Sequence, residues 1–115
     1  GQAELTNEAV AVLLALAGIL RNFPYPVVVE GHTDDIPIAN AQFASNWHLS
    51  SARAASVVDE LVYRGMNGAL VAPIGLSSEM PKVRNANAFA RSRNRRVTLK
   101  ISKTEAESLY GYLFQ

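Results

Sequence analysis

The sequence predicts an α/β protein in which helices cover a small sheet as a two-layer α/β sandwich. Two segments, 6–22 and 51–64, repeat apolar residues at helical spacing, and short apolar runs typical of strands alternate with them. Alternating helices and strands pack as layers around one core. Of the 115 residues, 49% are hydrophobic and 18% are charged. We therefore expect a single domain over 1–115, with its core at about 5–102.

The first helix is expected to begin after Thr6, a typical N-cap residue. Apolar residues return every three or four positions after it, at Ala9, Leu13, Leu16, Ala17 and Leu20. Pro24 and Pro26 cannot continue a helix, so this one should end near Asn22.

The next stretch pairs a buried strand with the start of a second helix. A run of three valines over 27–29 predicts a strand at 27–31 that leads into an acidic tip. Leu49 and Ser50 fit the N′ and N-cap positions of a helix over 51–64, which would place Arg53 in its first turn.

The remaining elements follow the same alternation. Gly65 fits the C′ position that ends the second helix. Beyond it we expect a strand at 70–76, a polar loop at 77–87, a short helix at 86–93, a strand at 95–102 and a helical segment at 104–114. Pro73 cannot donate a hydrogen bond to a neighbouring strand, which favours either an edge position for its own strand or a bulge within it.

The charge is nearly balanced, at +1, but it is unevenly distributed. Eight of the eleven Lys and Arg residues fall between Lys82 and Lys103, an interval that contains no acidic residue. A nucleic-acid-binding module is usually strongly basic, with aromatic residues between its basic ones. Between Arg84 and Arg96 the one aromatic residue is Phe89. A solvated strand edge, or arginines that hold an anion, therefore explains this run better than nucleic acid does.

The sequence also argues against cysteine-dependent sites and against a membrane span or signal peptide within the apolar run near its start. The chain has no cysteine, so it contains neither disulfides nor thiolate metal sites. The apolar run 10–20 is too short to cross a bilayer, and no basic segment precedes it. We interpret it as neither a membrane span nor a signal peptide.

Asp34 and Arg53 are the candidate binding residues. Asp34 follows the predicted strand, and Arg53 lies at the predicted N-terminus of the second helix. A cation is unfavourable at that end of a helix unless an anion lies beside it. A carboxylate that faces such an anion-ready helix end suits a small ligand with both an amine and a carboxylate. We expect both side chains at the surface.

Other interpretations of the same residues have less support. Asp34 and Asp35 could form a polar turn and no more, because Asp is common in turns. With His32 they could bind a divalent cation, although no third ligand cluster follows. A hydrolase needs a nucleophile and base or two matched carboxylates, and none occurs at suitable spacing. Phe43 and Trp47 are interpreted as loop anchors rather than a sugar-stacking surface.

A combined motif carries a family resemblance. It consists of Gly31-His32-Thr33-Asp34, Asn46-x-x-Leu49-Ser50-x-x-Arg53-Ala54, Gly65, Gly75 and Arg91-x-x-Asn94-Arg95-Arg96-Val97. This pattern resembles the OmpA-like peptidoglycan-binding domain over nearly the whole chain. The insertion from Asp35 to Trp47 is similar to the MotB type, found in flagellar stator subunits that include MotD and PomB.

The resemblance implies an OmpA-like βαβαβ topology whose first strand is truncated here. It also implies non-catalytic binding of the diaminopimelate residue in the peptidoglycan stem, without a cofactor. On this basis Asp34 pairs with the ligand ammonium and Arg53 holds the ligand carboxylate. Further residues line or border the same pocket: Thr33, Asn46, Leu49, Arg91, Asn94 and Arg95. The loop 36–45, which is longer than in outer-membrane members, is expected to reshape or partly cover it.

As a MotB-type domain, the chain is expected to be the periplasmic part of a bacterial inner-membrane protein. The resemblance implies a homodimer and a MotA-like channel subunit as partner, reached through a transmembrane part outside this sequence. No nucleic-acid partner is expected. Two alternatives stay open: a Pal- or OmpA-like anchor between outer membrane and wall, and, from another class, a muramyl-peptide hydrolase.

Overall fold

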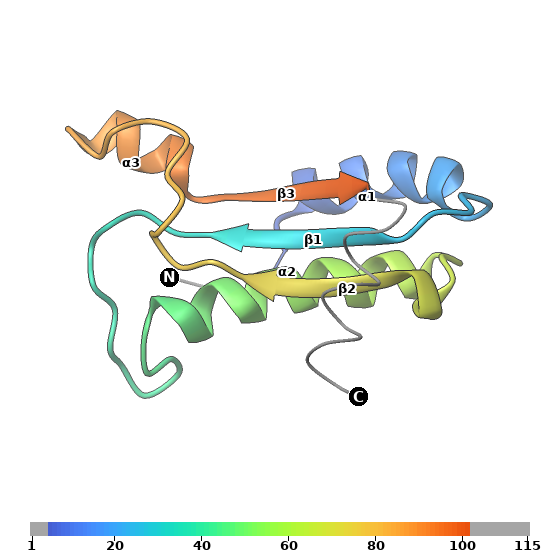
Figure 1. The fold of residues 1–115 in the computed structure, drawn as a ribbon, viewed down its shortest axis with the longest axis horizontal. Helices are drawn as coiled ribbons and strands as arrows, with labels where there is room; N and C mark the ends of the chain where they lie inside the picture. The colour runs from blue at the N-terminus through green and yellow to red at the C-terminus, as the bar shows by residue number, and fades with distance from the viewer. Residues whose placement is uncertain (1–4, 102–115) are drawn as a thin grey trace.

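The computed structural model describes residues 5–101 of the chain. In this range three α-helices and a three-stranded mixed sheet are formed (Figure 1), which confirms the predicted α/β class. In chain order the elements are α1 (Asn7–Leu20), β1 (Val27–His32), α2 (Asn46–Tyr63), the 3-10 turn η1 (Gly68–Leu70), β2 (Val71–Gly75), α3 (Ala88–Asn94) and β3 (Arg96–Ile101). The strand expected ahead of α1 and the helical segment predicted at 104–114 lie outside the described residues.

β1 is the central strand of the sheet, whose order is β2-β1-β3 (Figure 1). It runs parallel to β2 and antiparallel to β3, so Val29 lies opposite Pro73 on one side and Leu99 on the other. Pro73 is therefore on an edge strand, which is one of the two positions predicted from its missing N–H. The chain leaves β1 at the end of the sheet near which α3 lies, and the candidate site begins there.

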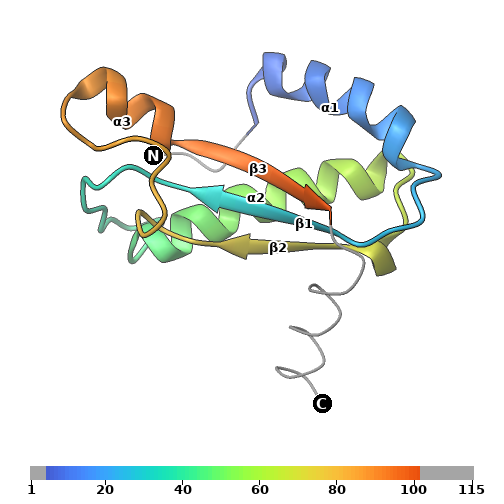
Figure 2. The same cartoon turned by 45° about the horizontal axis from the view of Figure 1, so that its top comes forward.

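The core fills the space between one face of the sheet and the helices α1 and α2 (Figure 2). Its buried side chains are Leu13, Ala17, Leu20, Val27, Val29, Ala54, Val57, Leu61 and Met66. Because side chains alternate across a strand, Val27 and Val29 share the face of β1 that meets both helices. This arrangement is the predicted two-layer sandwich, with α3 beyond the end of the sheet.

Helix α1 begins as the sequence predicts. The hydroxyl oxygen of Thr6 accepts a hydrogen bond from the backbone N–H of Ala9 at 3.1 Å, which satisfies one of the free donors at the helix N-terminus. The helix ends at Leu20, ahead of Pro24 and Pro26.

Helix α2 begins earlier than predicted. Its N-cap is Ser45, whose hydroxyl accepts from the N–H of His48, and not Ser50. Ser50 lies inside the helix and is fully buried, with its Oγ accepting the N–H of Ser77 at 3.0 Å. The extra first turn also buries Leu49, which is 4% exposed. By residue type, Ser45 and Ser50 could each cap the helix, and the burial of Leu49 and Ser50 decides in favour of Ser45.

The correction moves Arg53 to a new place on the helix. Since a helix has about 3.6 residues per turn, Arg53 lies two turns inside α2 rather than beside its free N–H groups. The predicted C-terminus is confirmed: Gly65 has a φ of 111°, and its N–H bonds to the carbonyl of Val62. Met66 N–H reaches the carbonyl of Leu61, which completes a Schellman motif.

Two glycines let α2 approach the sheet closely. A Cβ atom on Gly31 of β1 would collide with the backbone carbonyl of Ser50, and one on Gly75 of β2 would collide with Ser51. These contacts set α2 directly on the ends of β1 and β2. The side chains of the first two turns of α2 therefore lie next to the residues that follow β1.

Candidate ligand-binding pocket

A cavity of about 330 Å³ opens where β1 ends, between the following loop and the first two turns of α2. It is lined by Thr33, Asp34, Ile36, Pro37, Ile38, Asn46, Leu49, Arg53 and Arg95. The structure thus brings together six predicted site residues from three separate segments: the end of β1, the first two turns of α2, and the residue that follows α3. Ile36 to Ile38 and Leu49 form apolar walls, while the charges come from one carboxylate and two guanidinium groups.

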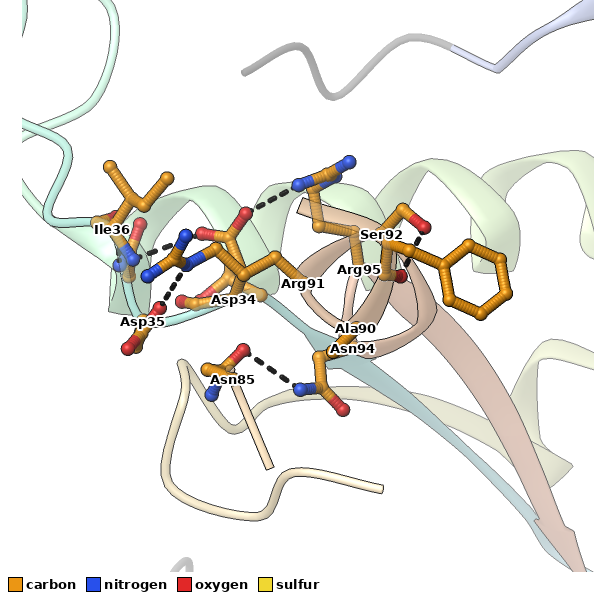
Figure 3. Close-up of polar contacts among 12 residues, drawn as sticks. Asp34, Asp35, Ile36, Asn85, Ala90, Arg91, Ser92, Asn94 and Arg95 are labelled. Carbon is orange, nitrogen blue, oxygen red and sulfur yellow. Dashed lines mark hydrogen bonds and ion pairs between the residues drawn. The ribbon is translucent and has the colours of Figure 1, made fainter. Parts of the chain in front are cut away.

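Asp34 supplies the carboxylate, and it is not the surface group that we expected. Its side chain is 11% exposed. Oδ1 accepts the backbone N–H of Ile36 at 3.1 Å, and Oδ2 accepts from Nη1 of Arg95 at 2.5 Å (Figure 3). The turn interpretation is therefore correct for one oxygen, which closes an Asx turn. The other oxygen belongs to the pocket.

Arg53 reaches the cavity from α2, where it is half-buried. Burial lowers the pKa of its guanidinium, the nearby Arg95 lowers it further, and Asp34 opposes both effects. The prediction that Arg53 stands beside the free N–H groups of α2 is wrong, because those groups belong to the turn capped by Ser45. Any attraction for an anion therefore comes from the two guanidinium groups and not from the helix end.

The loop after Asp34 is tied to the start of α2 by hydrogen bonds. The amide Nδ2 of Asn46 donates to the carbonyl of Ile36 at 3.0 Å. The hydroxyl of Thr33 donates to the carbonyl of Asp34 at 2.9 Å, while its N–H donates to the carbonyl of Ser77. Thr33 and Asn46 thus hold the cavity wall, and the longer loop shapes the pocket rather than lying apart from it.

Arg91 and Asn94 are the two predicted site residues that do not line the cavity. Arg91 donates through Nε to Oδ1 of Asp35 at 2.9 Å, which links α3 to the loop beside the pocket (Figure 3). Asn94 is fully buried and bonds to the backbone N–H groups of Lys82 and Val83 through Oδ1. Its Nδ2 donates to the carbonyl of Val83 and to Asn85. Both residues therefore position the segment that carries Arg95.

Comparison with known proteins identifies the family. The model of the OmpA family matches residues 1–95. The chain belongs to the OmpA family. Motility protein B of Bacillus subtilis is 34% identical over 103 residues, which span 88% of this chain and 40% of that protein. The peptidoglycan-binding protein ArfA of Mycobacterium tuberculosis is 37% identical over 76 residues, 66% of this chain and 22% of that protein. The chain thus spans less than half the length of these relatives.

Solved structures agree with this membership in the OmpA family. A putative MotB-like protein from Desulfovibrio vulgaris has a TM-score of 0.80 at 31% identity, covering 89% of this chain and 64% of that one. The cell wall anchor of the T6SS from Pseudomonas aeruginosa has a TM-score of 0.80 at 37% identity, covering 89% and 71% of the two chains. The fold of this OmpA-family domain is therefore shared with MotB-like and wall-anchor structures.

Three lining residues of the OmpA-family domain were not among the predicted site residues. Ile36, Pro37 and Ile38 line the cavity from the loop that follows β1. The insertion that contains them was recognised, but no periodic pattern marks which of its side chains face inward. The two aromatic residues interpreted as loop anchors differ in burial: Phe43 is 9% exposed, as expected of an anchor, whereas Trp47 is 50% exposed.

A larger cavity of about 490 Å³ lies between α1, α2 and β3. Its lining is mostly apolar, with Leu5, Val12, Leu16 and Leu99 among its residues, and includes no carboxylate. Arg53 and Arg95 line both cavities. Of the two cavities, the smaller is the better candidate site, because only its lining contains both a carboxylate and guanidinium groups.

Within residues 5–101, no three His, Asp or Glu side chains lie together as a possible set of metal ligands. The divalent-cation interpretation therefore has no support in this part of the chain. His32 is buried, and its Nε2 lies 3.3 Å from Oε1 of Glu30 on the same strand. Asp34 and Asp35 point instead to Arg95 and Arg91.

Among residues 5–101, none of the helices has the length and the apolar character that a membrane span requires.

Proposed function

We propose that this domain binds peptidoglycan without catalysis, through the diaminopimelate residue of the stem peptide, and so anchors a flagellar stator complex to the cell wall. One observation carries the proposal: a carboxylate and two guanidinium groups meet in one cavity of small-ligand size at the end of β1. Such a site can hold the free ammonium and carboxylate that diaminopimelate presents at a single carbon.

Each lining residue has a role in this proposal. Asp34 accepts the ligand ammonium, and Arg53 donates to the ligand carboxylate. Asn46 and Thr33 hold the wall, and Leu49 packs against the aliphatic part of the ligand. The cavity is open to solvent and small, so we expect modest affinity for one stem. Many stems on one polymer then raise the overall strength through avidity.

The stator role is supported by the likeness to Motility protein B. Under this proposal the domain lies in the periplasm, in a protein that forms a homodimer and joins a MotA-like channel subunit through parts outside this sequence. The described surface carries exposed apolar side chains on α1, such as Val12 and Ile19, that a second subunit could cover.

A second candidate is a wall anchor of another assembly, of the Pal or OmpA type. The likeness to the T6SS cell wall anchor supports wall anchoring in an assembly other than a flagellar motor. The two candidates share the peptidoglycan site. The full gene distinguishes them, since a stator subunit encodes one transmembrane helix ahead of this domain, whereas an outer-membrane anchor encodes a lipidation signal or a barrel.

Co-sedimentation with purified diaminopimelate-type sacculi tests the proposal. Asp34→Asn removes one charge with nearly the same side-chain shape, and Arg53→Gln removes one charge and the guanidinium fork, so each should lower the bound fraction about tenfold or more. The matched control is Arg64→Gln, which removes the ion pair with Glu60 at the far end of the same helix and should bind as wild type. Wild-type binding by Asp34→Asn or Arg53→Gln would remove that residue from the site.

A further inference from the structure

The carboxylate of Asp34 already has a cationic partner. Arg95 occupies Oδ2, while the N–H of Ile36 occupies Oδ1 (Figure 3). The Arg95 side chain is 43% exposed and that of Asp34 only 11%. Arg95 therefore covers the carboxylate from the solvent side. A ligand ammonium that comes to Asp34 meets this guanidinium first.

The charges of the cavity do not balance. Its lining contains one carboxylate, from Asp34, and two guanidinium groups, from Arg53 and Arg95. The two guanidinium groups are close enough for Arg95 to lower the pKa of Arg53. An anion placed between them would relieve this repulsion, and a carboxylate matches the fork of donors on each.

We propose that Arg95 exchanges partners when the ligand binds. It leaves Asp34 to the ligand ammonium and joins Arg53 on the ligand carboxylate. The inference rests on the proposed function and adds a mechanism of selection to it. The ion pair between Asp34 and Arg95 is exchanged for contacts of Asp34 with the ligand ammonium and of Arg95 with the ligand carboxylate.

The exchange makes both ligand charges necessary. A ligand with an ammonium but an amidated carboxylate would displace Arg95 from Asp34 and leave it facing Arg53 with no anion between them. A ligand with a carboxylate but no ammonium would give Asp34 no new partner. The domain should therefore distinguish stems whose distal carboxylate is free from stems in which that carboxylate is amidated.

Arg91 provides a matched control for Arg95. It lies in α3, whose C-cap is Arg95, and like Arg95 it pairs with an aspartate of the loop, through Nε to Oδ1 of Asp35 at 2.9 Å. It does not line the cavity, whereas Arg95 does. Removing the Arg91 guanidinium thus tests the loss of a charge and of an arginine–aspartate pair beside the pocket, including any shift of the segment, while the group that is proposed to exchange stays in place.

The experiment is calorimetric titration with two soluble stem tripeptides that end in diaminopimelate, one with its distal carboxylate free and one with it amidated. Wild type and Arg91→Gln should prefer the free acid by about tenfold or more. In Arg95→Gln the preference should fall to about threefold or less, because affinity for the free acid decreases while affinity for the amide holds or rises. Circular dichroism checks that each variant is folded.

Equal loss of affinity for both peptides in Arg95→Gln would overturn the inference, because a merely structural role for Arg95 predicts that result. Wild type that binds both peptides equally would overturn it as well, and would leave peptidoglycan binding intact. Wild type that binds neither peptide nor sacculi would overturn the proposed function itself. If Arg95→Gln does not fold, Arg95→Lys serves instead, since its single ammonium cannot grip a carboxylate through two donors and should also reduce the preference.

Discussion

His32 is the buried residue at the end of β1, one position before the pocket begins. It is 2% exposed, and its Nε2 contacts Oε1 of Glu30 at 3.3 Å. Burial lowers the pKa of its imidazole, and the charge of Arg96 lowers it further. The hydrogen bond to Glu30 acts in the opposite direction but is the weaker influence, and Lys100 adds to the lowering.

These effects predict a dependence of stability on pH. The unfolded chain takes up a proton on His32 near the reference pKa of about 6.5, whereas the folded protein takes it up only at lower pH. The unfolded state therefore binds more protons in this window, and the free energy of unfolding falls as pH drops below about 6.5. The slope for one proton is at most about 1.4 kcal/mol per pH unit.

Denaturant unfolding at about pH 7.5 and about pH 5.5 measures this slope. His32→Gln should flatten it, because the variant has no proton to take up at that position. His48→Gln is the matched comparison, since it removes the other histidine, which is exposed at the start of α2. An unchanged slope in His32→Gln would show that another group causes the dependence.

The sequence drew attention to Asp34 as a carboxylate after a buried strand, and the structure does place it there. Arg53 was selected as an arginine at a helix start, whereas α2 in fact begins after Ser45. The bond between Asp34 and Arg95 could not be predicted, because 61 positions separate the two in sequence. Such a contact follows from the sheet order, which places β3 beside β1.

At the scale of elements, the start of α2 decides where the site residues point. Ser45→Ala removes the oxygen that accepts the N–H of His48 and should lower the free energy of unfolding by about 1 kcal/mol. Ser56→Ala is the control, because its hydroxyl donates to the carbonyl of Ala52 inside the helix and caps nothing. A loss in Ser56→Ala as large as that in Ser45→Ala would contradict Ser45 as the cap.

The start of α2 also marks a limit of sequence reasoning. Ser45 and Ser50 are equally suitable N-cap residues by type, and local pattern favoured the second. The choice is made by contacts across the molecule: Leu49 enters the interior, and Ser50 binds the N–H of Ser77, 27 positions away. Helix ends that depend on such contacts are less predictable than helix existence, which was correct for α1, α2 and α3.

At the scale of the whole molecule, the site depends on how closely α2 lies on the sheet. Gly31→Ala would drive a Cβ into the backbone carbonyl of Ser50 and should reduce the free energy of unfolding by about 1–3 kcal/mol or more. Sacculus binding should fall too, since a displaced α2 carries Asn46 and Arg53 away from Asp34.

Gly18→Ala is the matched control for this prediction. Nothing lies within 4 Å of a Cβ at Gly18, which is inside α1. Alanine there should raise the free energy of unfolding by about 0.5–1 kcal/mol through helix propensity, with binding unchanged. Equal stability of Gly31→Ala and wild type, measured by denaturant unfolding, would mean that the spacing between α2 and β1 is not set by this contact.

The layered arrangement was predictable because it follows from periodicity alone. Val27 and Val29 read as a buried strand, and the helical spacing of Leu13, Ala17 and Leu20 matches the face that is in fact buried. The parallel and antiparallel neighbours of β1 were not assigned from the sequence, since apolar runs do not encode their partners. The motif resemblance supplied that information only at the level of the family.

The central claim is that the pocket recognises an ammonium and a carboxylate on one carbon of the peptidoglycan stem. The most direct measurement is release of the sacculus-bound domain by soluble stem tripeptides. A tripeptide that ends in diaminopimelate should release it, whereas one that ends in lysine should not at the same concentration, because its distal amine has no carboxylate beside it. Equal release by both peptides, or by neither while sacculus binding persists, would contradict recognition at Asp34 and Arg53.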